Sequence, residues 1–199
     1  MKKLALLLLG LFIYASNVNA QVDDRAVIPV AVTLNSILRL NVTSGGNIEF
    51  NFNTLNDYDS GIQTGAPYQT KFNVASSVNW DVFMYAEDAN LIGTDEIGVA
   101  NIMTLDNIGY HITSDGTIGA NVDLAFDAAA PGPLTNVTTT ILVGYDGATS
   151  NAGDINQNSF TIHWRCGTQE GSMNATSILS QTIAADRYAT NVFLLLQPN

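Results

Sequence analysis

The sequence predicts an all-β protein, a single antiparallel β-sandwich of the Greek-key kind. Three observations predict it: short runs in which apolar and polar residues alternate, polar turn clusters between these runs, and the lack of an amphipathic helix of ordinary length. With 199 residues, of which 46% are hydrophobic and 13% charged, the chain can bury a globular core. Because no internal repeat or linker divides residues 21–199, we expect them to form one domain.

Runs with a period of two follow one another along the chain. They cover residues 28–42, 48–52, 72–74, 80–86, 108–112, 122–126, 141–145, 160–166 and 187–196. Turn residues such as Asp115-Gly116 and the Pro-Gly-Pro sequence at 131–133 separate them. Residues 177–185 could hold one short helical turn. The pattern therefore predicts about ten short strands arranged in two packed layers.

The N-terminus has the features of a signal peptide. Lys2 and Lys3 precede an apolar stretch over residues 4–14, and the small residues at 18–20 match a signal-peptidase site. We expect residues 1–20 to be cleaved and the mature chain to begin at Gln21. The protein is then exported to the extracellular space or the cell surface, or alternatively to the periplasm. The apolar stretch is about half the roughly 20 residues that cross a bilayer, so we expect no membrane span.

The chain is strongly acidic, with 18 Asp and Glu residues against 7 Lys and Arg residues and a formal charge of −11. The electrostatic field of this negative charge repels the phosphate backbones of nucleic acids, so we expect no nucleic-acid partner. One cysteine and two histidines cannot supply a structural zinc site, and we expect no cofactor. Neither histidine lies in a nucleophile motif, so we predict that the protein is not an enzyme.

The alternation in residues 160–166 assigns the two faces of a strand. Phe160, Trp164 and Cys166 share one face, and His163 lies on the other. We predict that Cys166 is buried as a small hydrophobe, with a reactive thiol as the alternative. His163, and His111 in the run 108–112, are predicted to face solvent opposite an apolar face.

The first predicted strand, residues 28–42, is unusually long. Its apolar face consists of even-numbered residues, beginning with Ile28, Val30, Val32 and Leu34. At about 3.3 Å per residue the strand would extend roughly 50 Å, beyond a typical strand. In one interpretation, the chain bends near Asn35 and passes from one sheet to the other. In the other, residues 27–34 complete the sheet of a neighbouring subunit, which makes residues 21–35 a donor-strand extension.

The C-terminal run, residues 187–196, is mostly apolar, and its first two residues are Arg187 and Tyr188. In Greek-key sandwiches, a tyrosine at such a corner can donate a hydrogen bond back to the backbone while its ring packs inside. We therefore predict a final core strand and a structural role for Tyr188.

Four pieces of the sequence carry a resemblance to a known group of proteins. They are Leu38-Arg39-Leu40-Asn41-Val42, residues 46–50 with Gly61, residues 74–82 with Asn79-Trp80, and residues 188–196. Their order resembles bacterial surface β-sandwich proteins of the spore coat U and chaperone-usher fimbrial subunit type. The resemblance implies an immunoglobulin-like or pilin-like sandwich and a secreted, non-enzymatic structural or adhesive protein that assembles by β-strand addition. The implied partners are further copies of the chain or other subunits of a surface structure.

Calcium is the one metal for which the sequence offers candidate ligands. Asp154, Asn156 and Asn158 place oxygen ligands at alternating positions, as the start of a calcium loop does. Ser159 and Arg165 then stand where such a loop needs a glycine and a bidentate acid. A polar hairpin is therefore the competing interpretation.

Two aromatic residues point to an alternative function. Phe83 and Tyr85 lie on the parity opposite Trp80, on a strand face that is expected to be polar. Either a covered sheet or a binding patch explains them. The alternative to a surface subunit is therefore a secreted carbohydrate-binding module that contacts glycan through Phe83 and Tyr85, with calcium as a further ligand.

Overall fold

The computed structural model describes residues 28–94 and 99–199 of the chain. The chain divides into two units, residues 1–34 and 35–199. The predicted signal peptide, residues 1–20, and the predicted mature N-terminus lie outside the described residues. Within the first unit, residues 28–34 form neither helix nor strand.

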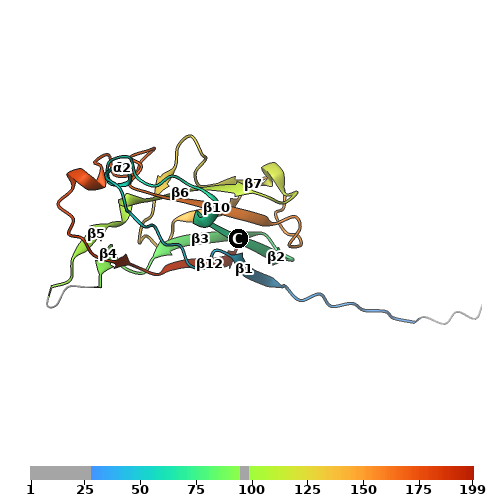
Figure 1. Cartoon of the computed structure of the whole chain (residues 1–199). Coiled ribbons are helices and arrows are strands. Elements are labelled where there is room, and N and C mark those ends of the chain that lie inside the picture. Colours follow the sequence, from blue (N-terminus) through green and yellow to red (C-terminus); the bar gives the residue numbers. More distant parts are fainter. Residues whose placement is uncertain (1–27, 95–98) are drawn as a thin grey trace, which may run out of the picture. The chain divides into compact units, whose positions relative to one another are not determined.

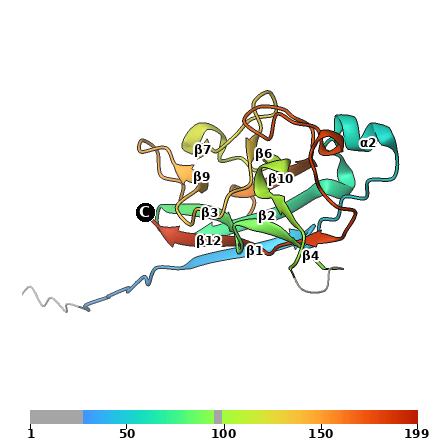
Figure 2. The same ribbon diagram turned by 90° about the vertical axis from the view of Figure 1, so that its left-hand side faces the viewer.

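The second unit is built mainly from β-strands (Figures 1 and 2). Its longer strands are β1 (Leu38–Ser44), β2 (Gln69–Ser76), β3 (Trp80–Ala86), β6 (Ile108–Ser114), β9 (Ile141–Tyr145), β10 (Ser159–Cys166) and β12 (Val192–Pro198). Its shorter strands are β4 (Asn90–Gly93), β5 (Ile102–Thr104), β7 (Val122–Leu124), β8 (Gly132–Pro133) and β11 (Tyr188–Ala189). The helical segments of this unit's described part are α2 (Leu55–Ser60) and the 3-10 turns Ala66–Tyr68, Leu105–Asn107, Gly119–Asn121 and Ile178–Ser180.

The strands form three antiparallel sheets. A five-stranded sheet has the order β1-β2-β10-β6-β8, a four-stranded sheet β12-β3-β9-β7, and a three-stranded sheet β11-β4-β5. The two larger sheets enclose the hydrophobic core between them, so the predicted all-β sandwich is confirmed. None of the helices among the described residues is long and apolar enough to cross a bilayer.

The core is filled by side chains of the central strands, and on β2 and β3 by every second one. On β2 and β3, Phe72, Val74, Val82 and Met84 are each at most 1% exposed. Other side chains that are at most 2% exposed are Trp80, Tyr110, Ile112, Leu142, Val143, Phe160 and Ile162. On β2 and β3 the period of two in the sequence is therefore the period of burial, whereas β6, β9 and β10 also bury consecutive side chains.

The prediction that the first strand begins at Ile28 is wrong, because β1 begins at Leu38. Immediately before β1, the Ile37 N–H donates to Ser77 Oγ at 2.9 Å, and the Ser77 N–H donates to the Ile37 carbonyl at 3.0 Å. Pro29 has no N–H to donate to a ladder. Alternating side chains mark a possible strand, but only a backbone partner makes one.

Residues 48–52 also lack the predicted strand pairing, although their side chains alternate in burial as predicted. The Phe50 ring stacks on Tyr68 with the centroids 4.6 Å apart. The Phe52 ring meets Tyr58 edge-on at 5.3 Å. Aromatic contacts therefore anchor this segment against the core without a backbone ladder.

The predicted final strand, residues 187–196, is divided between two sheets, because β11 pairs with β4 and β12 pairs with β3. On β12, Leu194 and Leu196 pack against the core. Phe193 and Leu195 face outward and are 43% and 37% exposed. The prediction of a core strand is thus correct for one face of β12 and wrong for the other.

Two local predictions are confirmed. The Tyr188 hydroxyl donates to the Ala184 carbonyl at 2.8 Å, and its ring packs against the core. Cys166 is 2% exposed, and burial raises the pKa of its thiol to about 12. A thiol held protonated in the core behaves as a small hydrophobe.

The helix α2 is not predicted by periodicity, but its start carries a local signal. The Asp57 N–H donates to Thr54 Oγ1 at 3.2 Å, while Asp57 Oδ2 accepts from the Thr54 N–H at 2.8 Å. This pair is a capping box. The backbone N–H groups of Asn53 and Thr54 hold the pKa of Asp57 below its usual range.

The short turn predicted within residues 177–185 is present as Ile178–Ser180.

Asn151 fixes the start of β3 inside the core. Its side chain is fully buried, and its Oδ1 accepts from the Trp80 N–H at 3.1 Å. Its Nδ2 donates to the Trp80 carbonyl at 2.8 Å, and the Trp80 indole donates to the Asn151 carbonyl at 2.8 Å. One residue therefore satisfies the three polar groups of a buried tryptophan.

We predict that Asn151→Ala lowers the free energy of unfolding by about 2–4 kcal/mol, because the Trp80 N–H and carbonyl are left buried without partners. Urea unfolding followed by tryptophan fluorescence measures this loss. Asn156→Ala, in an exposed turn, is the matched control and should change the free energy by less than about 0.5 kcal/mol. A loss below about 1 kcal/mol for Asn151→Ala would contradict the role given to this amide.

Candidate functional site

Two strands on one side of the sandwich have an edge with which no described strand pairs. β1 pairs with β2, β12 pairs with β3, and each ends its sheet. The two strands belong to different sheets but lie side by side, as Figures 1 and 2 both show. Their outer edges present backbone N–H and carbonyl groups that a further strand could pair with. We call this side, formed by Leu38–Ser44 and Val192–Pro198, the open seam.

The apolar residues of the open seam are less covered than the rest of the core. Leu38 and Leu40 on β1, and Leu194 and Leu196 on β12, point inward but stay partly exposed. Val42 on β1 is 42% exposed. Because the inward residues of β2 and β3 are almost fully buried, the lack of cover is confined to the edge. The open seam therefore offers apolar surface to a side chain from outside.

The open seam also lacks the usual protection of edge strands. β12 reads Val-Phe-Leu-Leu-Leu-Gln-Pro and has no charged residue, while β1 has one, Arg39. Prolines and bulges can block pairing, but Pro198 is the last residue of β12, and the irregularity of β1 lies near its end, between Val42 and Ser44. Most of each edge is therefore free of these obstacles to strand addition.

In the other unit, the four candidate assembly residues are strongly exposed. Ile28, Val30, Val32 and Leu34 have exposed fractions of 80%, 84%, 78% and 89%. No charged residue interrupts the stretch 28–34. Four exposed apolar residues at a period of two are what the buried face of a β-strand requires.

Phe83 and Tyr85 lie on the outer face of the four-stranded sheet. Tyr85 is paired with Phe193 across β3 and β12, and the two ring centroids are 5.5 Å apart. Phe83 is paired with Leu195 on one side and with Ile141 on the other. The structure thus brings the two candidate glycan contacts into one apolar patch. Sequence reasoning missed Phe193 and Leu195, because β12 is apolar at both odd and even positions and its sequence does not show which face is outside.

The candidate calcium ligands do not form one cluster. Asp154 and Asn156 are exposed, whereas Asn158 is fully buried and donates to the Asn151 carbonyl at 3.2 Å. Asp154 Oδ1 already accepts from the N–H groups of Asn156 and Gln157 at 2.9 and 3.1 Å. The loop is therefore a turn closed by its own aspartate. Among the described residues, no group of three His, Cys, Asp or Glu side chains could hold a metal.

The prediction that His111 and His163 face solvent is wrong. They are directly paired across β6 and β10, and their rings stack with centroids 4.5 Å apart and planes 1° from parallel. His111 is 5% exposed, and His163 is partly buried. Parity assigned these side chains to the outer face of the sheet correctly. The error was to equate an outer face with a solvated one, because loops cover this face.

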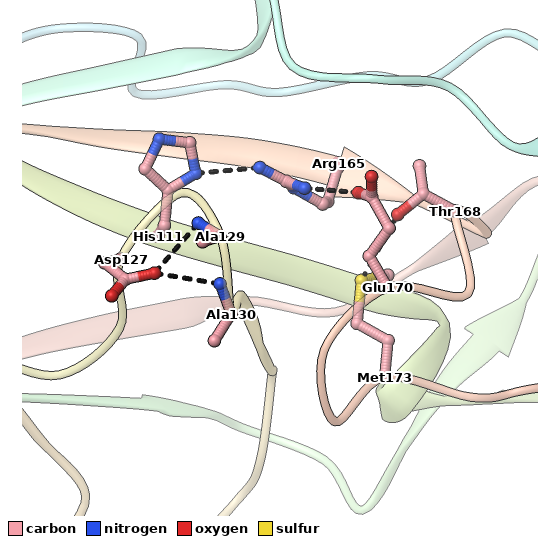
Figure 3. A network of polar contacts seen from close by, with 8 residues as sticks. All are labelled: His111, Asp127, Ala129, Ala130, Arg165, Thr168, Glu170 and Met173. Atoms are coloured by element: carbon pink, nitrogen blue, oxygen red, sulfur yellow. Dashed lines mark hydrogen bonds and ion pairs between the residues drawn. The ribbon is translucent and has the colours of Figure 1, made fainter.

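The stacked histidines belong to a polar cluster of four residues, His111, His163, Arg165 and Glu170. Arg165 is 3% exposed, donates to His111 Nδ1 at 2.9 Å, and forms an ion pair with Glu170 (Figure 3). Burial alone would raise the pKa of Glu170, but hydrogen bonds from Arg165 and other neighbours outweigh it and hold that pKa below its usual range. The cluster therefore pairs a buried cation with an ionised carboxylate.

Two loops cover the polar cluster, and we call them the outer layer, residues 127–131 and 167–173. Asp127 Oδ1 accepts from the N–H groups of Ala129 and Ala130, both at 2.8 Å, and so closes the first loop beside His111 (Figure 3). In the second loop, Met173 lies directly against Gly109, where an added Cβ would come within 2.1 Å of its sulfur. A side chain larger than hydrogen at this position of β6 would force the Met173 side chain to move.

Comparison with models of known protein families, and with curated proteins, finds no match to either.

We predict that Glu170→Gln lowers the free energy of unfolding by about 1–2 kcal/mol, because the buried Arg165 guanidinium loses its counter-charge. The loss is smaller than for a fully buried pair, since Glu170 faces solvent on one side. Glu49→Gln is the matched control, because the Arg187–Glu49 pair, at 3.7 Å, is exposed on both sides. It should change the free energy by less than about 0.5 kcal/mol in the same urea titration. Equal effects of the two substitutions would contradict the buried character of the Arg165 pair.

Proposed function

We propose that this protein is a secreted, non-enzymatic structural or adhesive subunit of a cell-surface assembly, which forms by β-strand addition between copies. The observation that carries the proposal is the open seam: two edge strands, side by side, each with one edge that no described strand pairs with, and with partly uncovered apolar residues. The proposed occupant is residues 28–34 of a second copy. The predicted signal peptide and the resemblance to pilin-like surface proteins support the same function.

The chemistry of the two surfaces is complementary. Alternate residues of a strand lie about 6.6 Å apart on one face, so the four apolar side chains of residues 28–34 would form a continuous row. Placed along the open seam, this row covers the exposed parts of Leu38, Leu40, Leu194 and Leu196. The backbone of the added strand pairs with an edge that is otherwise left to water. Burial of the row and satisfaction of the edge both favour assembly.

We predict that the double variant Val30→Asp/Val32→Asp remains monomeric, because each substitution would place an unpaired carboxylate in the apolar seam. Its thermal midpoint should stay close to that of the parent monomer, since both side chains are exposed in the single chain. The control Ala31→Asp/Thr33→Asp changes the opposite parity of the same segment and should still assemble. Light scattering after gel filtration, and negative-stain microscopy of surface material, measure the outcome. Assembly by the Val30/Val32 variant, or a parent that never assembles, would refute strand addition.

A mixing experiment separates the donor from the acceptor. Val42→Asp blocks the open seam but keeps residues 28–34, whereas Val30→Asp/Val32→Asp keeps the seam but loses the donor segment. Each variant alone should be monomeric, and the mixture should form a one-to-one complex that grows no further. Failure of this pair to combine, although the parent assembles, would show that assembly uses other surfaces.

Glycan binding at the apolar patch of Phe83 and Tyr85 is the second candidate function. The observation that favours it is the exposed ring of Phe193 beside Tyr85. A glycan array probed with the parent and with Phe193→Ala distinguishes the two functions. Binding that is lost in Phe193→Ala, while assembly persists, would support a carbohydrate-binding module.

A further inference from the structure

The polar cluster contains two titratable rings that the proposed function does not use. His111 and His163 are stacked beneath the outer layer, with Arg165 against the edge of one ring. Charged or titratable groups near His111 are His163, Arg165, Asp127 and Glu170; those near His163 are His111, Arg165, Asp115 and Lys71. The cluster is therefore a confined set of charges whose balance depends on the protonation of the two rings.

The hydrogen bonds assign a neutral ring to His111. Arg165 donates to His111 Nδ1, and a guanidinium has no acceptor, so this nitrogen must carry a lone pair. A proton added at Nδ1 would turn the contact, now 2.9 Å, into one donor facing another. Arg165 would then have to move, because nothing in its chemistry allows it to accept a hydrogen bond.

His163 differs from His111 in this respect. Its Nδ1 lies 3.3 Å from Gln69 Nε2, and its Nε2 lies 3.0 Å from Thr113 Oγ1. A proton added at Nδ1 can be accommodated when the Gln69 amide rotates and presents its oxygen, since a side-chain amide has both a donor and an acceptor end. The two rings are therefore not equivalent, and His111 is the one whose protonation breaks a contact.

Movement of Arg165 would reach the outer layer directly. Its guanidinium holds Glu170, which lies in the covering loop 167–173. That loop in turn contacts the other covering loop, because the Ser172 N–H donates to the Pro131 carbonyl at 3.2 Å. In the described part of the chain, Arg165 Nε has no hydrogen-bond partner, so His111 and Glu170 are the contacts that fix the guanidinium.

We propose that His111 and Arg165 form a pH-sensitive latch, which holds the outer layer on β6 and β10 at neutral pH and releases it on acidification. Protonation of His111 separates the ring from Arg165, weakens the link to Glu170, and frees residues 127–131 and 167–173 from the sheet. This inference is independent of strand addition, since the polar cluster and the open seam use different residues.

The direction of the pH dependence follows from the charges. Burial, together with the neighbouring His163 and Arg165, lowers the pKa of His111 to about 4, against the opposite effect of Asp127 and Glu170. An unfolded histidine titrates near 6.5, so between roughly pH 6.5 and 4 the unfolded chain binds a proton that the closed form excludes. Stability is therefore lost as pH falls through this window. Carboxylates such as Glu170, whose pKa is lowered, contribute their own loss as pH falls below about 4.3, where an unfolded glutamate titrates.

The test compares the full chain with two variants at pH 7 and pH 5. His111→Asn keeps an oxygen near the position of Nδ1 for Arg165 but does not titrate, and His163→Gln keeps a polar group near Thr113. We expect the folding equilibrium constant of the parent to fall about tenfold or more between the two pH values, measured by urea unfolding. The fall should be reduced to about threefold or less in His111→Asn and should persist in His163→Gln.

Hydrogen exchange locates the change and also tests the proposal if a variant fails to fold. After correction for intrinsic rates, amides of residues 127–131 and 167–173 in the parent should exchange at least about tenfold faster relative to those of β3 at pH 5 than at pH 7. NMR titration of the parent should show His111 still neutral at pH 6. An unchanged exchange ratio, a His111 that titrates near pH 6.5, or an equal pH dependence in the parent and His111→Asn would overturn the latch.

Discussion

A strand at the end of a sheet has backbone N–H and carbonyl groups along one edge that only water or a further strand can satisfy, and this constraint underlies the open seam. Both main sheets end on the same side, at β1 and β12, and the inward-facing side chains of these two strands stay partly exposed. A soluble sandwich commonly protects such edges with charge, bulges or a covering loop. Here, most of the two described edge strands has none of these features, and their residues are largely apolar. Residues 28–34 of the same chain carry no charge, and their apolar residues alternate as those of a strand do. The proposed strand addition between copies would account for both features at once.

The outer face of the five-stranded sheet differs from the open seam, because other parts of the same chain cover it. At β6 and β10 that face carries polar residues, yet two loops cover it, so His111 and Arg165 are almost completely buried. Buried charges are tolerated only when they are paired and hydrogen-bonded, which explains why Glu170 and a neutral His111 lie against the guanidinium. The sandwich therefore has one side where two sheets end in edge strands and one face that is covered by its own loops.

The sequence predicted the sandwich and the central strands because apolar residues alternate in them, and on β2 and β3 burial follows the same period of two, as in Phe72, Val74, Val82 and Met84. It also predicted the burial of Cys166 and the hydrogen bond of Tyr188, since both depend on local parity and a local turn. It could not place the first strand, because alternation in residues 28–42 is equally strong with and without a backbone partner.

Features that depend on distant segments were beyond a local pattern. Nothing near His111 in sequence indicates that a loop around Glu170 covers it, and nothing near Phe193 says whether its face of the strand is inside or outside. The convergence of β1 and β12 depends on the order of strands in two sheets, which side-chain periodicity does not encode. The candidate donor residues were identified from sequence, whereas the seam that would receive them required the structure.

The most direct measurement of strand addition is the hydrogen exchange of β12 in assembled and monomeric protein. In an antiparallel edge strand, alternate amides point away from the neighbouring strand, so about half of the β12 amides have no partner in the single chain. Strand addition predicts that these amides become strongly protected in the assembled form, together with those of residues 28–34. Assemblies in which both sets exchange as fast as in the monomer would contradict a strand paired along the open seam.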